Sequence, residues 1–161
     1  MIVERMGVRA RRSAAGAAHR EEIEVRTSAG FEFVDVTDEA AAVVGRSGIA
    51  DGLLSVQSLH TTAAVIVNEA EPLLLEDLRA ALERVAPRHL AYRHDDLALR
   101  EDVAPDEPAN GHAHCRALFL RASETLAVAH GRLRLGRWQR LFLVELDGPR
   151  SRTLCLTVLG G

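Results

Sequence analysis

The chain has 161 residues, of which 47% are hydrophobic and 27% charged, and its formal net charge is −3 at pH 7. This length suits one domain with a sizeable core, and the two cysteines are too few for a disulfide framework. Every basic residue is an arginine spread among acids, so we expect no binding to long nucleic acid. Because no apolar run could span a bilayer and no secretory signal is recognisable, we expect a cytoplasmic protein without membrane contacts.

The N-terminal part of the chain predicts an extension followed by two strands. Residues 1–20 carry several arginines without a compact apolar stretch, and we interpret them as an N-terminal extension of a single domain at residues 21–161. Residues 22–27 and 31–36 alternate apolar with polar side chains, as half-buried strands do. Ser28-Ala29-Gly30 supplies a turn between them, so the two strands are predicted to form a hairpin.

A short helix is predicted next. Thr37 and Asp38 suit its N-terminal cap, and it is expected to run to about Val44. Gly45 and Gly48 follow and are suited to ending it.

Two strands and the clearest helix of the sequence follow. Residues 53–59 and 63–67 are strand-like, and the unbroken apolar run at 63–67 favours cover on both faces of its sheet. Pro72 suits the first turn of a helix, and apolar residues recur at helical spacing from there to Val85. Pro87 is predicted to close this helix.

The C-terminal half predicts a long loop, a helix and several strands. Residues 93–111 are polar and rich in turn formers, and ordered loops of this length are often functional. A helix is expected from about His112 to Leu120, and a hairpin near Gly131 and Gly136. Further strands are predicted at 125–128, 138–146 and 153–159. Since strands outnumber helices without βαβ alternation, we expect an α+β fold, with a largely antiparallel sheet or sandwich and helices packed on it.

Several histidines lie in polar surroundings. His60 precedes two threonines, His94 is followed by two aspartates, and His112 and His114 lie two residues apart after Asn110. Histidine and carboxylate clusters favour metal binding, but no compact signature such as HExxH is present. From the residues alone, two interpretations stay open: metal ligation and hydrogen-bonded structural histidines. Cys115 follows His114, and we interpret it as a small packed residue rather than a nucleophile.

The strand at 138–146 contains a second candidate group. Glu145 shares a face with Leu141 and Leu143, so we expect it to be partly buried, and a buried carboxylate needs a partner or a proton. Arg150 and Arg152 follow a Gly-Pro turn and are suited to supplying that partner. The pattern fits an arginine-stabilised turn, and it also fits an anion pocket in which arginine binds phosphate bidentately. No P-loop, dinucleotide glycine motif or nucleophile elbow is present.

The order and spacing of short segments across about Glu22–Gly160 resembles the YjbQ-like family (the UPF0047 group). No single segment is diagnostic, but the ordered set is specific. The segments are Ser47-Gly48-Ile49, Asp51-Gly52, His60-Thr61-Thr62-Ala63, Asn68-Glu69, Asp77-Leu78, Tyr92-Arg93-His94-Asp95, Asn110, Ala113-His114, Gly131-Arg132-Leu133, Leu135-Gly136, Trp138-Gln139 and Glu145-Leu146-Asp147-Gly148-Pro149-Arg150.

This resemblance implies an α+β fold that assembles as a homotrimer with a polar, metal-capable pocket. It also implies a secondary thiamine-phosphate synthase activity, which joins hydroxymethylpyrimidine diphosphate to thiazole phosphate and releases pyrophosphate. The alternative is a non-catalytic, trimeric metal- or anion-binding protein. Arg137 departs from the family pattern, because a small residue usually precedes the Trp-Gln pair.

Carried over position by position, the resemblance implies three groups of site residues. His60, His94 and His114 are the expected ligands of a divalent metal such as zinc. The expected catalytic residues are Glu69, Gln139 and Glu145, and the residues expected to bind a phosphorylated small molecule are Thr61, Asn110 and Arg150.

Overall fold

The computed structural model describes residues 2–13, 16–101 and 103–160. Its strands are β1 (Ile2–Ser13), β2 (Gly16–Arg26), β3 (Glu32–Asp35), β4 (Gly52–Ser58), β5 (Ala63–Glu69), β6 (Ser123–Ala129), β7 (Arg132–Leu133), β8 (Gln139–Glu145) and β9 (Ser151–Gly160). Its helices are α1 (Thr37–Ser47), α2 (Pro72–Val85) and α3 (Gly111–Ala117), with short 3₁₀ helices η1 (Arg93–Asp95) and η2 (Leu97–Leu99).

The strands form two antiparallel sheets. One has six strands in the order β1-β2-β9-β4-β6-β7, and the other has three in the order β3-β8-β5. Neighbouring strands in both sheets run antiparallel. The predicted α+β fold with a largely antiparallel sheet architecture is therefore confirmed.

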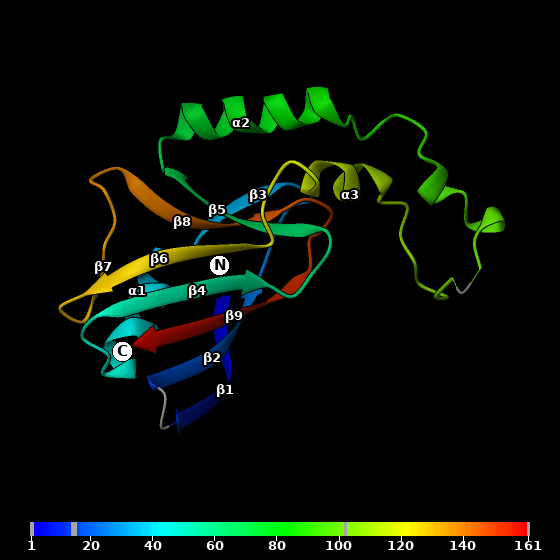
Figure 1. The fold of residues 1–161 in the computed structure, drawn as a ribbon. Helices are drawn as coiled ribbons and strands as arrows, with labels where there is room; N and C mark the ends of the chain where they lie inside the picture. The colour runs from blue at the N-terminus through cyan, green and yellow to red at the C-terminus, as the bar shows by residue number, and fades with distance from the viewer. Residues whose placement is uncertain (1, 14–15, 102, 161) are drawn as a thin grey trace.

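The three-stranded sheet forms the middle layer of the molecule, between the helices α2 and α3 and the six-stranded sheet (Figure 1). On β8, Leu141 and Leu143 join the main core with the six-stranded sheet and α1. The intervening Phe142 and Val144 join a second core that includes residues of α3 and is packed by Leu75 of α2. The apolar run at 63–67 is divided between the same two cores, so its predicted cover on both faces is confirmed.

The predicted hairpin between residues 22–27 and 31–36 is wrong. β2 pairs with β1 and β9 in the larger sheet, whereas β3 pairs with β8 in the smaller one. The turn redirects the chain between sheets because the Glu32 carboxylate accepts hydrogen bonds from the backbone N–H groups of Ser28 and Ala29 at 2.6 and 3.2 Å. Alternation identified both strands correctly but carried no information about their partners.

Three helix termini also differ from expectation. α1 continues through Gly45 to Ser47 and ends before Gly48, whose φ angle is 67°, instead of ending near Val44. Thr37 is the first residue of α1 rather than its cap: its hydroxyl donates to Asp35 and accepts the N–H of Leu141 at 2.8 Å, which ties the helix to β8. α3 ends at Ala117 instead of Leu120. By contrast, α2 begins at Pro72 as predicted, and the side chain of Glu71 caps it.

The other expected elements are present with somewhat different bounds. β6 and β9 extend beyond the predicted 125–128 and 153–159. The predicted hairpin at Gly131 joins β6 to β7, where His130 and Gly131 both have positive φ angles, of 53° and 70°. β2 starts at Gly16, so the predicted domain boundary at residue 20 falls inside a strand.

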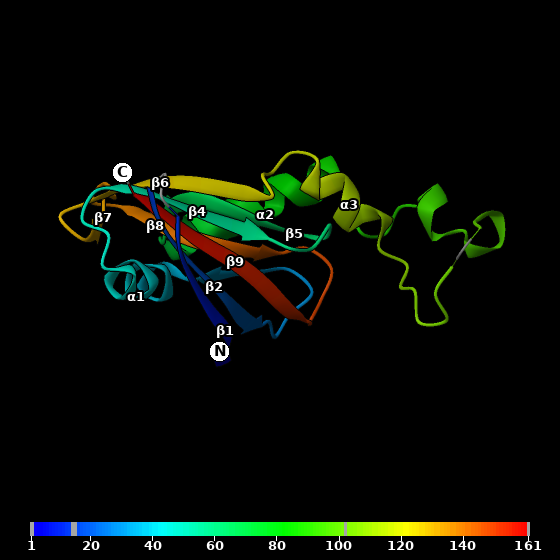
Figure 2. The same ribbon diagram turned by 60° about the horizontal axis from the view of Figure 1, so that its bottom comes forward.

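Residues 93–101 and 103–110, which we call the arm, belong to the connection between α2 and α3 and project from the layered body in both views (Figures 1 and 2). The expected loop therefore exists, and it contains the two short 3₁₀ helices. None of the helices that the structure describes is long and apolar enough to cross a membrane.

Candidate functional site

An open cavity of about 620 Å³, which we call the histidine pocket, lies between the arm, α3, the loop from β4 to β5 and the segment from the end of β8 to the start of β9. It brings together six of the nine predicted site residues. These six are His60, Thr61, His94, Asn110, His114 and Arg150. Its other lining residues are Thr62, Arg100, Glu107, Pro108, Asp147, Ser151 and Arg152.

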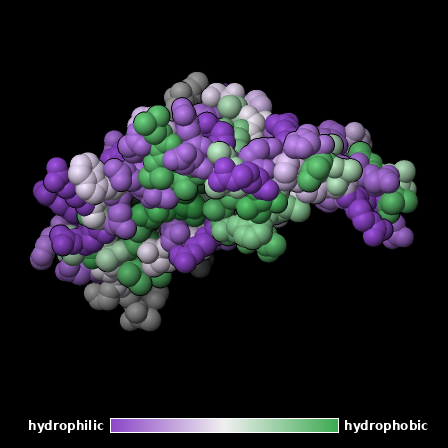
Figure 3. Space-filling model, turned by 90° about the horizontal axis from the view of Figure 1, so that it is seen from above, coloured by the Kyte–Doolittle hydropathy of each residue, from purple (hydrophilic) through white to green (hydrophobic). Residues whose placement is uncertain are grey.

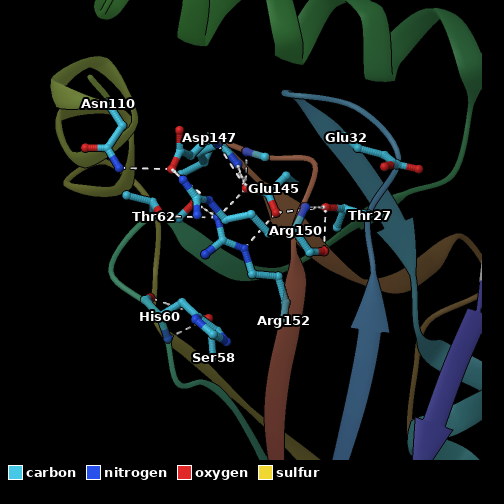
Figure 4. Close-up of polar contacts among 12 residues, drawn as sticks. Thr27, Glu32, Ser58, His60, Thr62, Asn110, Glu145, Asp147, Arg150 and Arg152 are labelled. Carbon is cyan, nitrogen blue, oxygen red and sulfur yellow. Dashed lines mark hydrogen bonds and ion pairs between the residues drawn. The ribbon is translucent and has the colours of Figure 1, made fainter. Parts of the chain in front are cut away.

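Glu145 lies beneath this pocket in a fully occupied polar cluster (Figure 4). Its side chain is 0% exposed, deeper than the partial burial expected. One oxygen accepts the backbone N–H groups of Leu146, Asp147 and Gly148 at 2.9–3.0 Å. Burial opposes ionisation, but the hydrogen bonds from Arg152 and the backbone outweigh it and lower the pKa of Glu145.

Arg152 is the partner that the buried carboxylate requires. Its guanidinium donates to both oxygens of Glu145, at 2.7 Å from Nε, and to the Thr62 hydroxyl at 3.1 Å. The Thr27 hydroxyl adds a further donor to Glu145 at 3.0 Å. Because so many donors surround the carboxylate and no solvent reaches it, the geometry favours a structural role for Glu145 over proton transfer.

The turn that follows β8 wraps closely around this carboxylate. A Cβ on Gly148 would lie 2.9 Å from the Glu145 Oε2 atom, so only glycine fits there without displacement. The turn directs Asp147 and Arg150 into the histidine pocket, where the Arg150 Nε and Nη2 atoms lie 3.0 and 2.9 Å from one carboxylate oxygen of Asp147. The same oxygen accepts the side-chain amide of Asn110 at 2.9 Å.

His60 is held by the backbone of β9. Its Nε2 atom accepts the N–H of Thr153 at 2.7 Å, which requires that nitrogen to be unprotonated. Burial lowers the pKa of His60, and the guanidinium of Arg152 lowers it further. His60 is therefore a neutral imidazole at pH 7 that already uses one nitrogen as an acceptor.

His94 and His114 form a ring pair, with centroids 4.7 Å apart and planes inclined by 65°. Asp95 brings the arm to this place by accepting the backbone N–H of Gly111 at 2.7 Å. A Cβ on Gly111 would lie 2.5 Å from the Cβ of Tyr92, which immediately precedes the arm, and 3.1 Å from the Oδ1 atom of Asp95, so the close contact between this segment and α3 depends on glycine. Burial lowers the pKa of His114, and the adjacent His94 lowers it further.

Two polar atoms at the site are buried without a hydrogen-bond partner among the described residues. They are the Nε2 atom of His94 and the Oδ1 atom of Asn110. The nearest acid to His94 Nε2 among the described residues is Glu107, at 3.8 Å, which is too long for a hydrogen bond. Buried polar atoms without partners are costly, so these two suit contact with a ligand.

The pocket contains three guanidinium groups, and each is paired with a carboxylate. Arg100 Nη1 donates to Glu107 at 2.8 Å, while Arg150 pairs with Asp147 and Arg152 with Glu145. Arg100 Nε and Nη2 and Arg150 Nη1 have no partner within the parts of the chain that the structure describes. These groups can donate to an anion while the carboxylates hold the arginines in place.

The predicted metal ligands do not form a complete site. Among the described residues, no three histidine, cysteine or acidic side chains are arranged to hold a metal ion. Nε2 of His60 is already occupied by Thr153, and only His94 and His114 are in contact with one another. A catalytic zinc normally has three protein ligands, so a metal bound here would need a ligand in addition to His94 and His114, and metal binding by the three histidines stays a prediction.

Glu69 and Gln139 lie away from the histidine pocket. They pair with each other across β5 and β8, whereas Glu145 pairs with Ala63 at the other end of the same ladder. Six residues of strand separate the two ends by about 20 Å. Glu69 lines a different, smaller cavity, and Gln139 accepts the N–H of Gly136, so neither joins the histidines within one chain.

Sequence reasoning overlooked several pocket residues. Arg100, Glu107 and Asp147 were not predicted as site residues, although the first two belong to the long loop that was expected to be functional. Tertiary contact joins them to the histidines, and the available signal was the density of charge in a turn-rich loop. Cys115 was expected to pack, but it is exposed.

Comparison with known proteins places this fold and sequence in one family. The family model described as UPF0047 protein YjbQ-like matches residues 21–161. A UPF0047 protein of Methanothermobacter thermautotrophicus is 37% identical over 142 residues, covering 88% of this chain and 92% of the relative.

Solved structures agree with this relationship. A YbjQ-like protein of unknown function from Sulfolobus solfataricus has a TM-score of 0.80 at 36% identity, covering 89% of this chain and 98% of the other. A hypothetical protein from Aeropyrum pernix has a TM-score of 0.78 at 37% identity, with 88% and 98% covered. The names of these relatives state no reaction. The chain belongs to the YjbQ-like, UPF0047 family.

Proposed function

We propose that the histidine pocket binds a phosphorylated small molecule and that the chain is an enzyme acting on it. The observation that carries the proposal is the proximity of two unlike groups: imidazoles with lowered pKa and guanidiniums with unused donors line the same open cavity. Arginine is well suited to phosphate recognition, and a neutral imidazole can exchange a proton at physiological pH.

In this proposal, the ligand's phosphate lies against the unpaired donors of Arg100 and Arg150. Those two groups would also stabilise a leaving phosphate or diphosphate as its charge increases. His114 is neutral at pH 7 because burial lowers its pKa, so one of its ring nitrogens is available to accept a hydrogen bond from a donor group of the substrate. Asn110 Oδ1 is available as an acceptor for a hydroxyl or amino group of the ligand.

The first reaction to test is the thiamine-phosphate synthesis implied by the family resemblance. In that reaction the thiazole nitrogen forms a bond to the pyrimidine methylene carbon, the carbon–oxygen bond to diphosphate breaks, and pyrophosphate leaves with the electron pair. The arginines would hold the departing pyrophosphate.

The test is pyrophosphate release by purified protein supplied with the two precursors. We expect measurable turnover that falls at least tenfold in His114→Asn, while the matched variant His89→Asn, at an exposed histidine outside the pocket, keeps the original rate. Equal rates for His114→Asn and the unchanged protein would refute the role of His114.

A non-catalytic anion-binding protein is the second candidate, and the pairing of every pocket arginine with a carboxylate favours it because such pairs are fixed before ligand binds. It predicts that pyrophosphate raises the Tm, through binding to the folded state, without turnover of any phosphorylated precursor.

A divalent metal and a homotrimer are separate proposals. Elemental analysis of untagged protein tests the metal: near-stoichiometric zinc that is lost in His94→Ala would support it, and metal-free protein after reconstitution would refute it.

Exposed apolar residues favour assembly into a trimer. Leu73, Leu118 and Phe119 are 68%, 81% and 64% exposed, and apolar residues gather on the face shown in Figure 3. A solution mass of three times 17.5 kDa would support the trimer.

A further inference from the structure

A second cavity, of about 440 Å³, lies outside the histidine pocket. We call it the Phe31 pocket. It is bounded by α2, by the segment that follows α2, by α3 and by the turn between β2 and β3. Its lining residues are Gly30, Phe31, Glu76, Arg79, Ala80, Glu83, Arg88 and Arg116. None of them lines the histidine pocket.

Phe31 gives this cavity an aromatic wall that attracts cations. The guanidinium carbon of Arg116 lies 5.1 Å from the centre of the Phe31 ring, and that of Arg79 lies 5.7 Å from it. Both distances are within the range of cation–π attraction. The ring is also packed against Phe33, with centroids 5.6 Å apart, so the wall is supported from the core.

Arg116 is held in place by hydrogen bonds but keeps one donor group without a partner. It is 1% exposed, its Nε atom donates to the Ala86 carbonyl at 2.9 Å, and its Nη2 atom pairs with Glu83. The remaining Nη1 group has no partner among the residues that the structure describes. Holding a guanidinium in this way lowers the ordering cost of binding an anion.

Arg79 and Arg88 add two further cations. Neither guanidinium makes an ion pair or a hydrogen bond within the described chain, although Glu76 and Glu83 lie nearby on α2. Gly30 leaves room for Arg88, because a Cβ at that position would stand 2.7 Å from the Arg88 Nη1 atom.

The charge of the Phe31 pocket is positive. Three guanidiniums face two carboxylates, and Glu83 is already occupied by Arg116 and by the backbone N–H of Arg88 at 2.8 Å. The hydrogen bond from Arg88 lowers the pKa of Glu83, and the proximity of Arg116 lowers it further, so this acid stays ionised and keeps Arg116 in place.

We propose that the Phe31 pocket is a second anion-binding site, specific for a small organic phosphate with an apolar or aromatic body. The phosphate binds to the free donors of Arg79, Arg88 and Arg116, and the apolar body packs against the part of Phe31 that lines the cavity and against Ala80. The proposal does not depend on the function of the histidine pocket, because the two cavities share no residue.

The experiment uses phenyl phosphate and the full chain, with binding followed by backbone amide chemical shifts and by calorimetry. We expect the amides of Gly30 and Phe31 to shift at saturation. In the double variant Arg79→Gln/Arg88→Gln, the affinity for phenyl phosphate, measured from the shifts of these two amides, falls at least tenfold. The matched variant Arg84→Gln, which removes an arginine from α2 outside the pocket lining, changes the affinity by less than twofold.

Two comparisons separate this site from the histidine pocket and test its specificity. Arg100→Gln leaves the shifts of Gly30 and Phe31 unchanged even if it abolishes all binding in the histidine pocket. Methyl phosphate binds at least tenfold more weakly than phenyl phosphate if the aromatic wall contributes. Unshifted Gly30 and Phe31 amides, an Arg84→Gln effect as large as that of the double variant, or equal affinity for the two phosphates would overturn the proposal.

Discussion

The Glu145 cluster and the His94–His114 ring pair above it are neighbours that differ in how well their polar atoms are hydrogen-bonded. Glu145 and Arg152 are 0% and 3% exposed and satisfy each other together with backbone N–H groups and threonine hydroxyls. Above them, His94 Nε2 and Asn110 Oδ1 are buried without partners among the described residues. A saturated buried cluster holds the structure together, whereas unsatisfied atoms beside a cavity are suited to a ligand.

This contrast separates residues that build the pocket from residues that meet a ligand. Glu145 was predicted to be catalytic, but its surroundings suit a scaffold for the turn that carries Asp147 and Arg150. His94 and His114 have the opposite character, because their rings contact each other and line the cavity, and no described residue makes a hydrogen bond to His94 Nε2.

The largest expected effect comes from breaking the saturated cluster. In Glu145→Gln the buried guanidinium of Arg152 loses its counter-charge, so the free energy of unfolding should fall by about 3–5 kcal/mol. Denaturant unfolding measures it. The matched variant Glu124→Gln removes the partner of the exposed Arg121 and should cost less than about 1 kcal/mol. Similar losses in both variants would contradict the assignment of Glu145 to the scaffold.

An intermediate effect is expected where the arm meets α3. Gly111→Ala places a Cβ against Tyr92, which should destabilise the protein by about 1–3 kcal/mol and separate His94 from His114. The control is Gly45→Ala in α1, where a Cβ meets no atom within 4 Å and the helix should gain up to about 1 kcal/mol. Thermal or denaturant unfolding distinguishes the two, and a neutral Gly111→Ala would show that the arm is not held by this contact.

The smallest effect concerns the pH dependence of stability. Burial lowers the pKa of His112 below 6.5, and Arg116 lowers it further, so the folded chain binds this proton less readily than the unfolded chain. The resulting stabilisation is complete above pH 6.5 and is lost as the pH falls through the folded pKa.

His112→Phe should therefore make the loss of stability between pH 7.5 and 5.5 shallower, by at most about 1.4 kcal/mol per pH unit. The pKa values of Glu21 and Glu145 are lowered from 4.5, that of Glu21 to about 2, so these acids lose their contribution only below this window. An unchanged slope in His112→Phe would contradict the proposed titration.

The local sequence pattern was sufficient to predict most strands and helices, but it did not predict which strands pair with one another. The apolar residues of β8 predicted that Glu145 would be at least partly buried, and the apolar run in β5 predicted cover on both faces, because each property depends on one strand. The partner of β2 could not be predicted, since the same alternation fits a hairpin or a place beside β9.

The candidate site was likewise predicted only as far as short sequence segments reveal it. The short segment around His60 and the one from Asn110 to His114 were identified, and they lie in one pocket. Their relation to Arg100 and Glu107 depends on how the arm folds back, which no periodicity encodes. Glu69 and Gln139 resemble family site residues in sequence, yet the antiparallel register of β5 and β8 places them at the far end of the ladder from Glu145.

The central claim is that the histidine pocket binds phosphate groups. Its most direct test is a titration with pyrophosphate in which the histidine ring resonances are followed by NMR. The account predicts that the ring resonances of His60, His94 and His114 shift and that the pKa of His114 rises, because a nearby anion favours the imidazolium form. The exposed His89 and His130, which lie outside the pocket, should not respond. Unmoved pocket histidines, or equal responses from all five, would contradict the assignment of this pocket as a phosphate-binding site.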